Sequence, residues 1–252
     1  MDKINLPNNW DEIYYDQFLL LKELDLSESS YYAKNISRLA ILTDTLEDDE
    51  VWEDIDVEEL SVMIKGLYWL KTEPSTDFSR KIGDLTFKEI NKISFGEFID
   101  LEYYFSTDYF LHLPEICAIL YRKTKQDEWG NTIFEPYDNI NIDERKNLFN
   151  DLPISNIYGI IKEYLKFKDL INNTYKNLFE ITLDESELDE EPEAYDEEEQ
   201  AEIAYENKIA KWSWENVLNK LSNGDLTKYE DITNLSIIFI LNQLSYRKDM
   251  DI

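Results

Sequence analysis

The 252-residue chain has little cysteine, histidine, glycine or proline: one, one, six and six residues. Cys117 is the only cysteine, so an internal disulfide and a cysteine-based zinc site are both excluded. Because glycine and proline interrupt regular structure, their scarcity favours long helices over a sandwich or barrel with many turns. The six glycines are isolated from one another, so no glycine-rich loop can hold a phosphate group.

Long apolar runs are also absent. The longest, LSIIFIL, begins at Leu235 and is far shorter than the roughly 20 residues that a membrane-spanning helix needs. The N-terminal stretch MDKINLPNNWDEIYY has neither the basic nor the apolar region of a secretory signal. We therefore expect a cytosolic protein that has no membrane partner.

Sequence motifs of catalysis are missing as well. There is no GxxxxGK[ST] loop, no GxGxxG, no HExxH and no nucleophile elbow. His112 and Cys117 are five residues apart, which places helical residues on different faces, so they are not expected to form a nucleophile pair. We therefore predict that the chain is not an enzyme and has no catalytic residue, cofactor or metal. A hydrolase that uses only carboxylates stays an open alternative.

Aromatic and acidic residues, in contrast, are abundant. Aromatic residues make up 14% of the chain and apolar residues 43%, which suffices for a sizeable core. The net charge is −30, and removing the fourteen acids between Glu180 and Glu206 still leaves −16. Since this charge repels nucleic acid backbones and anionic membranes, we expect no direct nucleic acid binding. A basic protein partner, mimicry of nucleic acid, or high solubility alone would each fit such a charge.

The most acidic stretch is DESELDEEPEAYDEEEQ, residues 184–200, with eleven acids and no base. It is too charged to pack in a core, and Pro192 interrupts its first half. We interpret residues 181–200 as an acidic linker that leads into a helix. The alternatives are a DNA mimic that inhibits an enzyme, and a calcium site, although the spacing and turn glycine of an EF-hand are missing.

Apolar residues recur at helical spacing along most of the chain. The expected helices cover residues 10–24, 27–43, 57–72, 94–105, 113–123, 143–152, 154–179, 201–225 and 236–249. The predicted fold class is mainly α, an irregular multi-helix bundle with at most a short hairpin or strand pair around 82–93 and 129–137. YYDQFLLLKEL and SFGEFIDLEYYF share a rhythm, as any two amphipathic helices can, but no strict repeat is present.

Local signals mark some helix ends. Ser94 and Glu97 have the spacing of a capping box, in which each side chain bonds the backbone N–H of the other residue. Gly224 lies where a left-handed C-terminal cap is expected. Arg247 and Lys248 follow the last apolar stripe, where cations complement the negative end of the helix dipole.

Two tryptophans occur in KWSWENVL, at positions 212 and 214. Residues two apart on a helix point roughly 200° from each other, so both cannot lie on one buried face. Either one of them anchors an interface, or both are buried between this helix and the rest of the fold.

Several segments together resemble the tail-assembly chaperones of long-tailed bacteriophages and related phage morphogenesis proteins. These segments are LPEICAILYRK, PYD, DERKNLFNDLPISNIYGIIKEYLKF and WSWENVLNKLSNGDLTKYEDITNLSIIFILNQLSYRKD, separated by an acidic variable stretch. The resemblance covers roughly residues 85–249. The region before Leu85 does not align with the family.

The resemblance implies an all-helical, acidic binding protein in the host cytoplasm that keeps tape-measure or tail-tube protein soluble until assembly. A structural, neck or packaged protein of the virion, bound to neck or portal subunits, is the alternative, and a homo-oligomer is possible in either case. The implied partner-binding surface lies on the last two helices. Its residues are Trp212, Trp214, Leu218, Leu221, Ile237, Leu241 and Leu244.

The resemblance also suggests how the chain is divided. We expect a helical main domain over residues 1–180, composed of N-terminal helices (1–80) and a family-like core (85–180). The acidic linker (181–200) and a C-terminal helical unit (201–252) follow.

Overall fold

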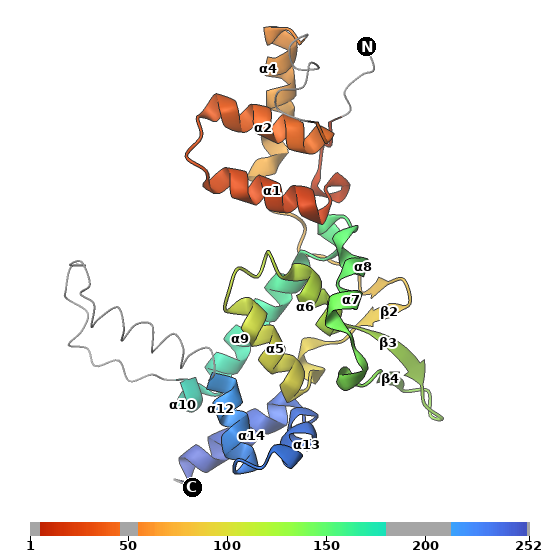
Figure 1. Ribbon diagram of the computed structural model, residues 1–252, viewed down its shortest axis with the longest axis vertical. Helices are drawn as coiled ribbons and strands as arrows, with labels where there is room; N and C mark the ends of the chain where they lie inside the picture. The colour runs from red at the N-terminus through yellow and green to blue at the C-terminus, as the bar shows by residue number, and fades with distance from the viewer. Residues whose placement is uncertain (1–5, 46–54, 180–212, 251–252) are drawn as a thin grey trace, which may run out of the picture. The chain divides into compact units, whose positions relative to one another are not determined.

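The computed structural model of the chain describes residues 6–45, 55–179 and 213–250 (Figure 1). The predicted acidic linker and Trp212 lie outside the described residues. The described residues form mainly α-helices with one small antiparallel sheet, so the predicted fold class is confirmed. Within these ranges no helix combines the length and the apolar character needed to cross a membrane.

The chain forms two compact units whose segments alternate along the sequence. The first unit consists of Met1–Phe87, Tyr109–Glu135 and Ile140–Glu163, and the second of Lys88–Asp108, Pro136–Asn139 and Tyr164–Ile252. In the second unit, α5 (Phe95–Phe105) packs against α13 (Tyr229–Thr233) and α14 (Ile237–Asp249), which lie far along the chain. The predicted order of domains stays a prediction.

In the first unit, α1 (Tyr15–Leu26) and α2 (Tyr31–Thr43) pack against each other, as Figure 1 shows in red and orange. The predicted helices here are confirmed. The Ser30 hydroxyl caps α2 by accepting a hydrogen bond from the Ala33 N–H. The next helix, α4 (Val57–Gly66), packs against α2 and has no buried residue of its own.

The core of the first unit is built around α6 (Leu113–Leu120), in which every residue except Glu115 is buried. It packs against α7 (Ile142–Arg145) and α8 (Asn147–Asn150). The prediction of a helix over 113–123 was wrong at its end. The chain passes directly from Leu120 into a strand, because the following backbone pairs with a strand more than thirty residues earlier.

The sheet has the order β1-β2-β3-β4, and each neighbouring pair is antiparallel. Its strands are β1 (Lys81–Ile82), β2 (Leu85–Phe87), β3 (Tyr121–Gln126) and β4 (Thr132–Phe134). The extended segments expected around 82–93 and 129–137 thus contribute three of the four strands. The unpredicted β3 joins them, pairing with β2 on one side and β4 on the other.

In the second unit, the predicted capping box begins α5. The Ser94 hydroxyl accepts from the Glu97 N–H, and the Glu97 carboxylate accepts from the Ser94 N–H. Glu97 is fully buried, and its charge is balanced by the Lys88 ammonium at 2.7 Å. This burial and pairing fix the start of the helix.

The remaining helices of the second unit come from the last third of the chain. They are α10 (Lys176–Phe179), α12 (Ser213–Ser222), α13 and α14. The helix predicted from residue 154 begins there only as a 3-10 turn (Ile154–Asn156). The α-helix, α9 (Gly159–Thr174), starts five residues later, in the first unit, and continues in the second. Gly224 takes a φ of 76°, as its predicted role in a left-handed cap requires.

One β-bridge closes the first unit. Tyr14, at the start of α1, pairs in antiparallel fashion with Pro153. Beside this pair the Ile154 N–H donates to the Ile13 carbonyl at 2.7 Å, and both isoleucines are fully buried. A junction of two residues thus connects segments 139 positions apart.

The second unit repeats this arrangement. Ser94, at the start of α5, pairs with Ser236, and the Ile237 N–H donates to the Ile93 carbonyl at 3.2 Å. Both isoleucines are again fully buried. In each unit a 3-10 turn, a buried isoleucine, the bridge residue and a helix follow in the same order. The shared rhythm of the two sequence stretches therefore reflects a repeated structural motif.

Candidate functional site

A groove of about 760 Å³ opens in the second unit, among α9, α10, α12 and α14. Figure 1 shows α10, α12 and α14 near one another in this unit. Its apolar lining consists of half-buried side chains, which are Leu178, Phe179, Trp214, Val217, Leu221 and Leu244. Pockets of this size and composition are typical of sites that bind an organic ligand or a few side chains of a partner.

One face of α12 supplies three of these six apolar side chains. Trp214, Val217 and Leu221 follow the spacing i, i+3, i+7 and so share one side of the helix. Leu218 and Ser222, four residues apart, are buried on the side facing the core. The helix therefore has one set of side chains that is buried in the second unit and another set that lines the groove.

Trp214 is held in position by other rings of the second unit. Its indole meets Phe98 edge-on at a centroid distance of 4.8 Å, with Phe95 at 6.0 Å and Phe179 at 6.3 Å. Edge-to-face contacts at these distances stabilise aromatic pairs beyond the area that they bury. The groove thus has an aromatic side chain that is held in place by other rings and is still partly exposed.

The wall from α5 and α9 is electrostatically balanced. The Tyr164 hydroxyl donates to the Glu102 carboxylate at 2.8 Å, and the Lys168 ammonium lies 3.0 Å from the same oxygen. Burial raises the pKa of Tyr164 well above its usual value, and the Glu102 charge adds to the effect. Tyr164 therefore stays a neutral donor, and the Lys168–Glu102 pair leaves little net charge on this wall.

Three further cations line the groove. Lys220 on α12, and Arg247 and Lys248 on α14, line it with exposed side chains. Among the residues that the structure describes, none of these three forms an ion pair. The groove thus combines an apolar surface with cations that have no acidic partner in the described part of the chain, which suits the binding of a ligand.

The structure divides the predicted partner-binding residues into two groups. Trp214, Leu221 and Leu244 line the groove. The other residues that can be placed are buried in the second unit, and these are Leu218, Ile237 and Leu241. The role of all seven residues in partner binding, Trp212 included, stays a prediction.

Sequence reasoning did not select several residues of the groove. Val217 has the helical spacing that would have indicated it, three residues after Trp214. Leu178 and Phe179 precede the acidic stretch, and no pattern in the sequence places them beside α14. The basic residues Arg247 and Lys248 were interpreted only as partners of the helix dipole.

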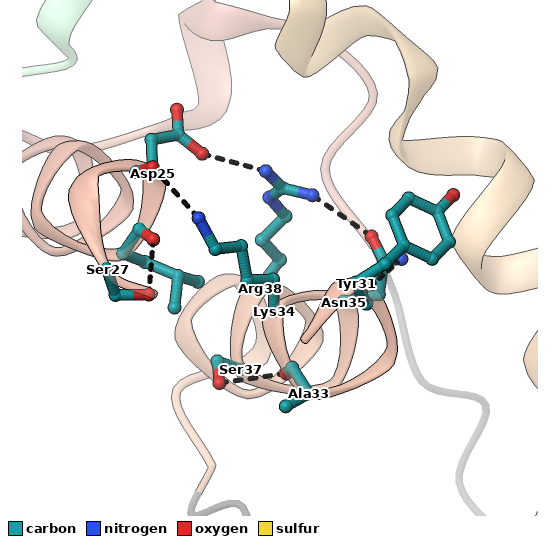
Figure 2. A network of polar contacts seen from close by, with 9 residues as sticks. Asp25, Ser27, Tyr31, Ala33, Lys34, Asn35, Ser37 and Arg38 are labelled. Atoms are coloured by element: carbon teal, nitrogen blue, oxygen red, sulfur yellow. Dashed lines mark hydrogen bonds and ion pairs between the residues drawn. The ribbon is translucent and has the colours of Figure 1, made fainter. Parts of the chain in front are cut away.

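A smaller pocket of about 280 Å³ lies in the first unit, near α1, α2 and α4. Figure 2 shows the polar network on one of its sides. The Arg38 guanidinium donates to the Asp25 carboxylate at 2.7 Å and to the Asn35 side chain at 3.1 Å, and the Lys34 ammonium donates to the Asp25 carbonyl. These groups bind one another and connect α1 to α2, so the network has a structural role.

The described part of the chain offers neither an activated cysteine nor a metal-binding cluster. Cys117 is fully buried, and burial raises the pKa of its thiol well above the usual value, so it is not a reactive nucleophile. Across residues 6–45, 55–179 and 213–250, no cluster of three or more His, Cys, Asp or Glu side chains could hold a metal ion.

Comparisons with protein-family models, curated proteins and solved structures give no match to this chain. The groove of the second unit and the charge of the chain are therefore the features from which a function can be inferred.

Proposed function

We propose that this chain is a non-enzymatic assembly protein of a bacteriophage, a tail-assembly chaperone that keeps tape-measure or tail-tube protein soluble. The observation that carries the proposal is the groove of the second unit, where Trp214, Leu221 and Leu244 expose apolar surface on rigid helices. The resemblance of the sequence segments to that family supports the same function.

Two physical requirements of a holding protein are met. It must cover apolar surface of its client, and burial of such surface contributes about 25 cal/mol per Å². A groove among helices suits a client helix that inserts its apolar face. It must also keep the complex from associating further, and a net charge of −30 opposes such association.

Co-expression with candidate clients tests the proposal. The chain is produced together with the tape-measure or tail-tube protein of the same phage, and the soluble fraction of the client is measured. We expect Leu221→Asp with Leu244→Asp to abolish this effect, because two carboxylates in the apolar groove are costly to desolvate. Leu226→Asp is the matched control, since Leu226 is 72% exposed and lies outside the groove.

If neither client becomes more soluble with the unchanged chain, the proposal is wrong. Mass spectrometry of purified particles provides a second test. A chaperone is absent from mature virions, whereas a structural or packaged protein is recovered in stoichiometric amounts.

A further inference from the structure

We infer that the partner segment bound in the groove is an amphipathic helix with acidic flanks. Its apolar side chains lie against the Trp214–Val217–Leu221 stripe of α12, and its carboxylates lie against the cations of α12 and α14. The inference rests on the proposed function, because it specifies the chemistry of the segment that is held.

The unpaired cations provide the first argument. The chain has 55 acids and 25 Lys and Arg residues, so a cation on its surface readily finds an acidic neighbour. Lys168 does so, at 3.0 Å from Glu102. Lys220, Arg247 and Lys248 line the same groove and have no such neighbour in the described part of the chain. Their charge is available to the carboxylates of a ligand.

The helix dipole explains only part of this arrangement. All three cations lie in the last turn of α12 or α14, where a positive charge is favourable. The interaction of a cation with the helix dipole depends only on how close the cation lies to the C-terminal end of its own helix. It does not require the ends of two helices to open onto one apolar groove, which is the arrangement that a ligand with apolar and acidic groups needs.

An anionic lipid also combines apolar and acidic groups, but it carries its charge at one headgroup. Here the cations come from two helices and border an open groove. A helix presents several side chains along its length, and grooves between helices accept one amphipathic helix through anchors at i, i+3 and i+7. The groove therefore fits an acidic helix better than a lipid.

Binding of two labelled peptides to the full chain tests the inference. Both are amphipathic helices of about 18 residues with the same leucine stripe, and one has Glu on its flanks where the other has Lys. Fluorescence anisotropy is measured at an ionic strength of about 0.15 M. We expect the Glu peptide to bind more tightly, although the net charge of −30 favours the Lys peptide. Tighter binding of the Lys peptide would overturn the inference.

Charge reversal locates the binding site. Arg247→Glu with Lys248→Glu should weaken binding of the Glu peptide by about tenfold or more, because two attractive contacts become repulsive. Lys125→Glu with Lys166→Glu is the matched control. Both lysines are exposed and lie outside the groove, and the net charge changes equally. An equal loss in the two variants would reveal a bulk charge effect and contradict the inference.

Other occupants give different results. Stronger binding to vesicles of phosphatidylglycerol and phosphatidylcholine than to the Glu peptide would identify a lipid site. Peptide binding seen only after the eleven acids of residues 184–200 are changed to Gln would indicate competition by the chain itself. Either result would overturn the inference.

Failure of the inference is distinguishable from failure of the proposed function. Suppose that the unchanged chain keeps the client soluble, but the variant Arg247→Glu with Lys248→Glu binds the Glu peptide normally. The proposed chaperone function is then supported, and the inferred preference of the groove for acidic helices is wrong. If the client is never solubilised, the proposed function itself fails.

Discussion

At the scale of single residues, the carboxyl group of Asp100 on α5 is under opposing influences. Burial raises its pKa above the usual 3.8, and the negative charges of Glu215 and Glu97 raise it further. The hydrogen bond donated by the Tyr137 hydroxyl acts in the other direction but does not outweigh burial. Since the folded state binds this proton more tightly than the unfolded state, the ionised carboxylate opposes folding.

Asp100→Asn should therefore stabilise the protein at pH 7, because asparagine is uncharged and its carbonyl can still accept from Tyr137. Ionisation of Asp100 reduces stability as the pH rises through its folded pKa, and the penalty is absent below pH 3.8. The gain from Asp100→Asn should therefore vanish as the pH falls to that value. Urea unfolding at both pH values measures this difference.

The control for this prediction is Asp169→Asn, which removes an exposed acid of α9 and so reports only the general effect of charge. If Asp100→Asn is less stable than wild type at pH 7, the bond between the ionised carboxylate and Tyr137 is worth more than the penalty of burial.

At the scale of elements, the start of α9 depends on the absence of a side chain. A Cβ added at Gly159 would lie 2.0 Å from the carbonyl oxygen of Thr76 and 2.9 Å from the ring of Phe78. The first of these contacts is with backbone, which cannot move aside as a flexible side chain can. The helix can therefore pack against this segment only through glycine.

We predict that Gly159→Ala lowers the free energy of unfolding by about 1–3 kcal/mol, the usual cost of overpacking. The loss should occur even though alanine is favoured over glycine within a helix by about 1 kcal/mol. Gly66→Ala is the matched control, because Gly66 is also helical but has nothing within 4 Å of the added Cβ. Denaturant unfolding of the two variants should give effects of opposite sign, and equal effects would contradict the proposed clash.

Elements whose signals are local could be predicted from the sequence, whereas those fixed by distant partners could not. The capping box of Ser94 and Glu97 involves residues three apart, and the prediction was correct. The first half of strand β3, Tyr121–Lys123, was mistaken for the end of a helix because its extended backbone depends on pairing with β2, which is distant in sequence.

The same limit applied to the candidate site. Helical spacing identified apolar stripes on α12 and α14, but it could not tell which residues of each stripe are buried inside the second unit. Leu218 and Leu241 were therefore selected although they are buried. The residues Phe179 and Lys220 were missed because only the folded unit brings them together.

At the scale of the whole molecule, self-repulsion is the dominant electrostatic effect. With a net charge of −30, the folded state is stabilised by salt, because salt screens the repulsion between the acidic side chains. The screening length falls from about 30 Å at 0.01 M salt to about 10 Å at 0.1 M. Isolated surface ion pairs, such as Lys92–Glu89 with both side chains more than half exposed, are too weak to offset this.

We therefore predict that Tm rises with NaCl over this range, by about 2–4 °C for each kcal/mol of repulsion removed. Thermal unfolding followed by circular dichroism measures the shift. Changing the eleven acids of residues 184–200 to Gln reduces the net charge to −19 and should reduce the rise. A fall in Tm with salt would mean that attractive pairs outweigh repulsion.

The two β-bridges impose an order on biosynthesis. Pro153 leaves the ribosome 139 residues after Tyr14, and Ser236 follows Ser94 by 142 residues. At translation rates of about 5–20 residues per second, the second residue of each bridge is synthesised roughly 7–28 s after the first. For most of that interval Phe95 and Phe98, buried in the finished protein, lack the Trp214 indole that packs against them. The exposed rings make the growing chain prone to aggregation until its C-terminal helices have been synthesised.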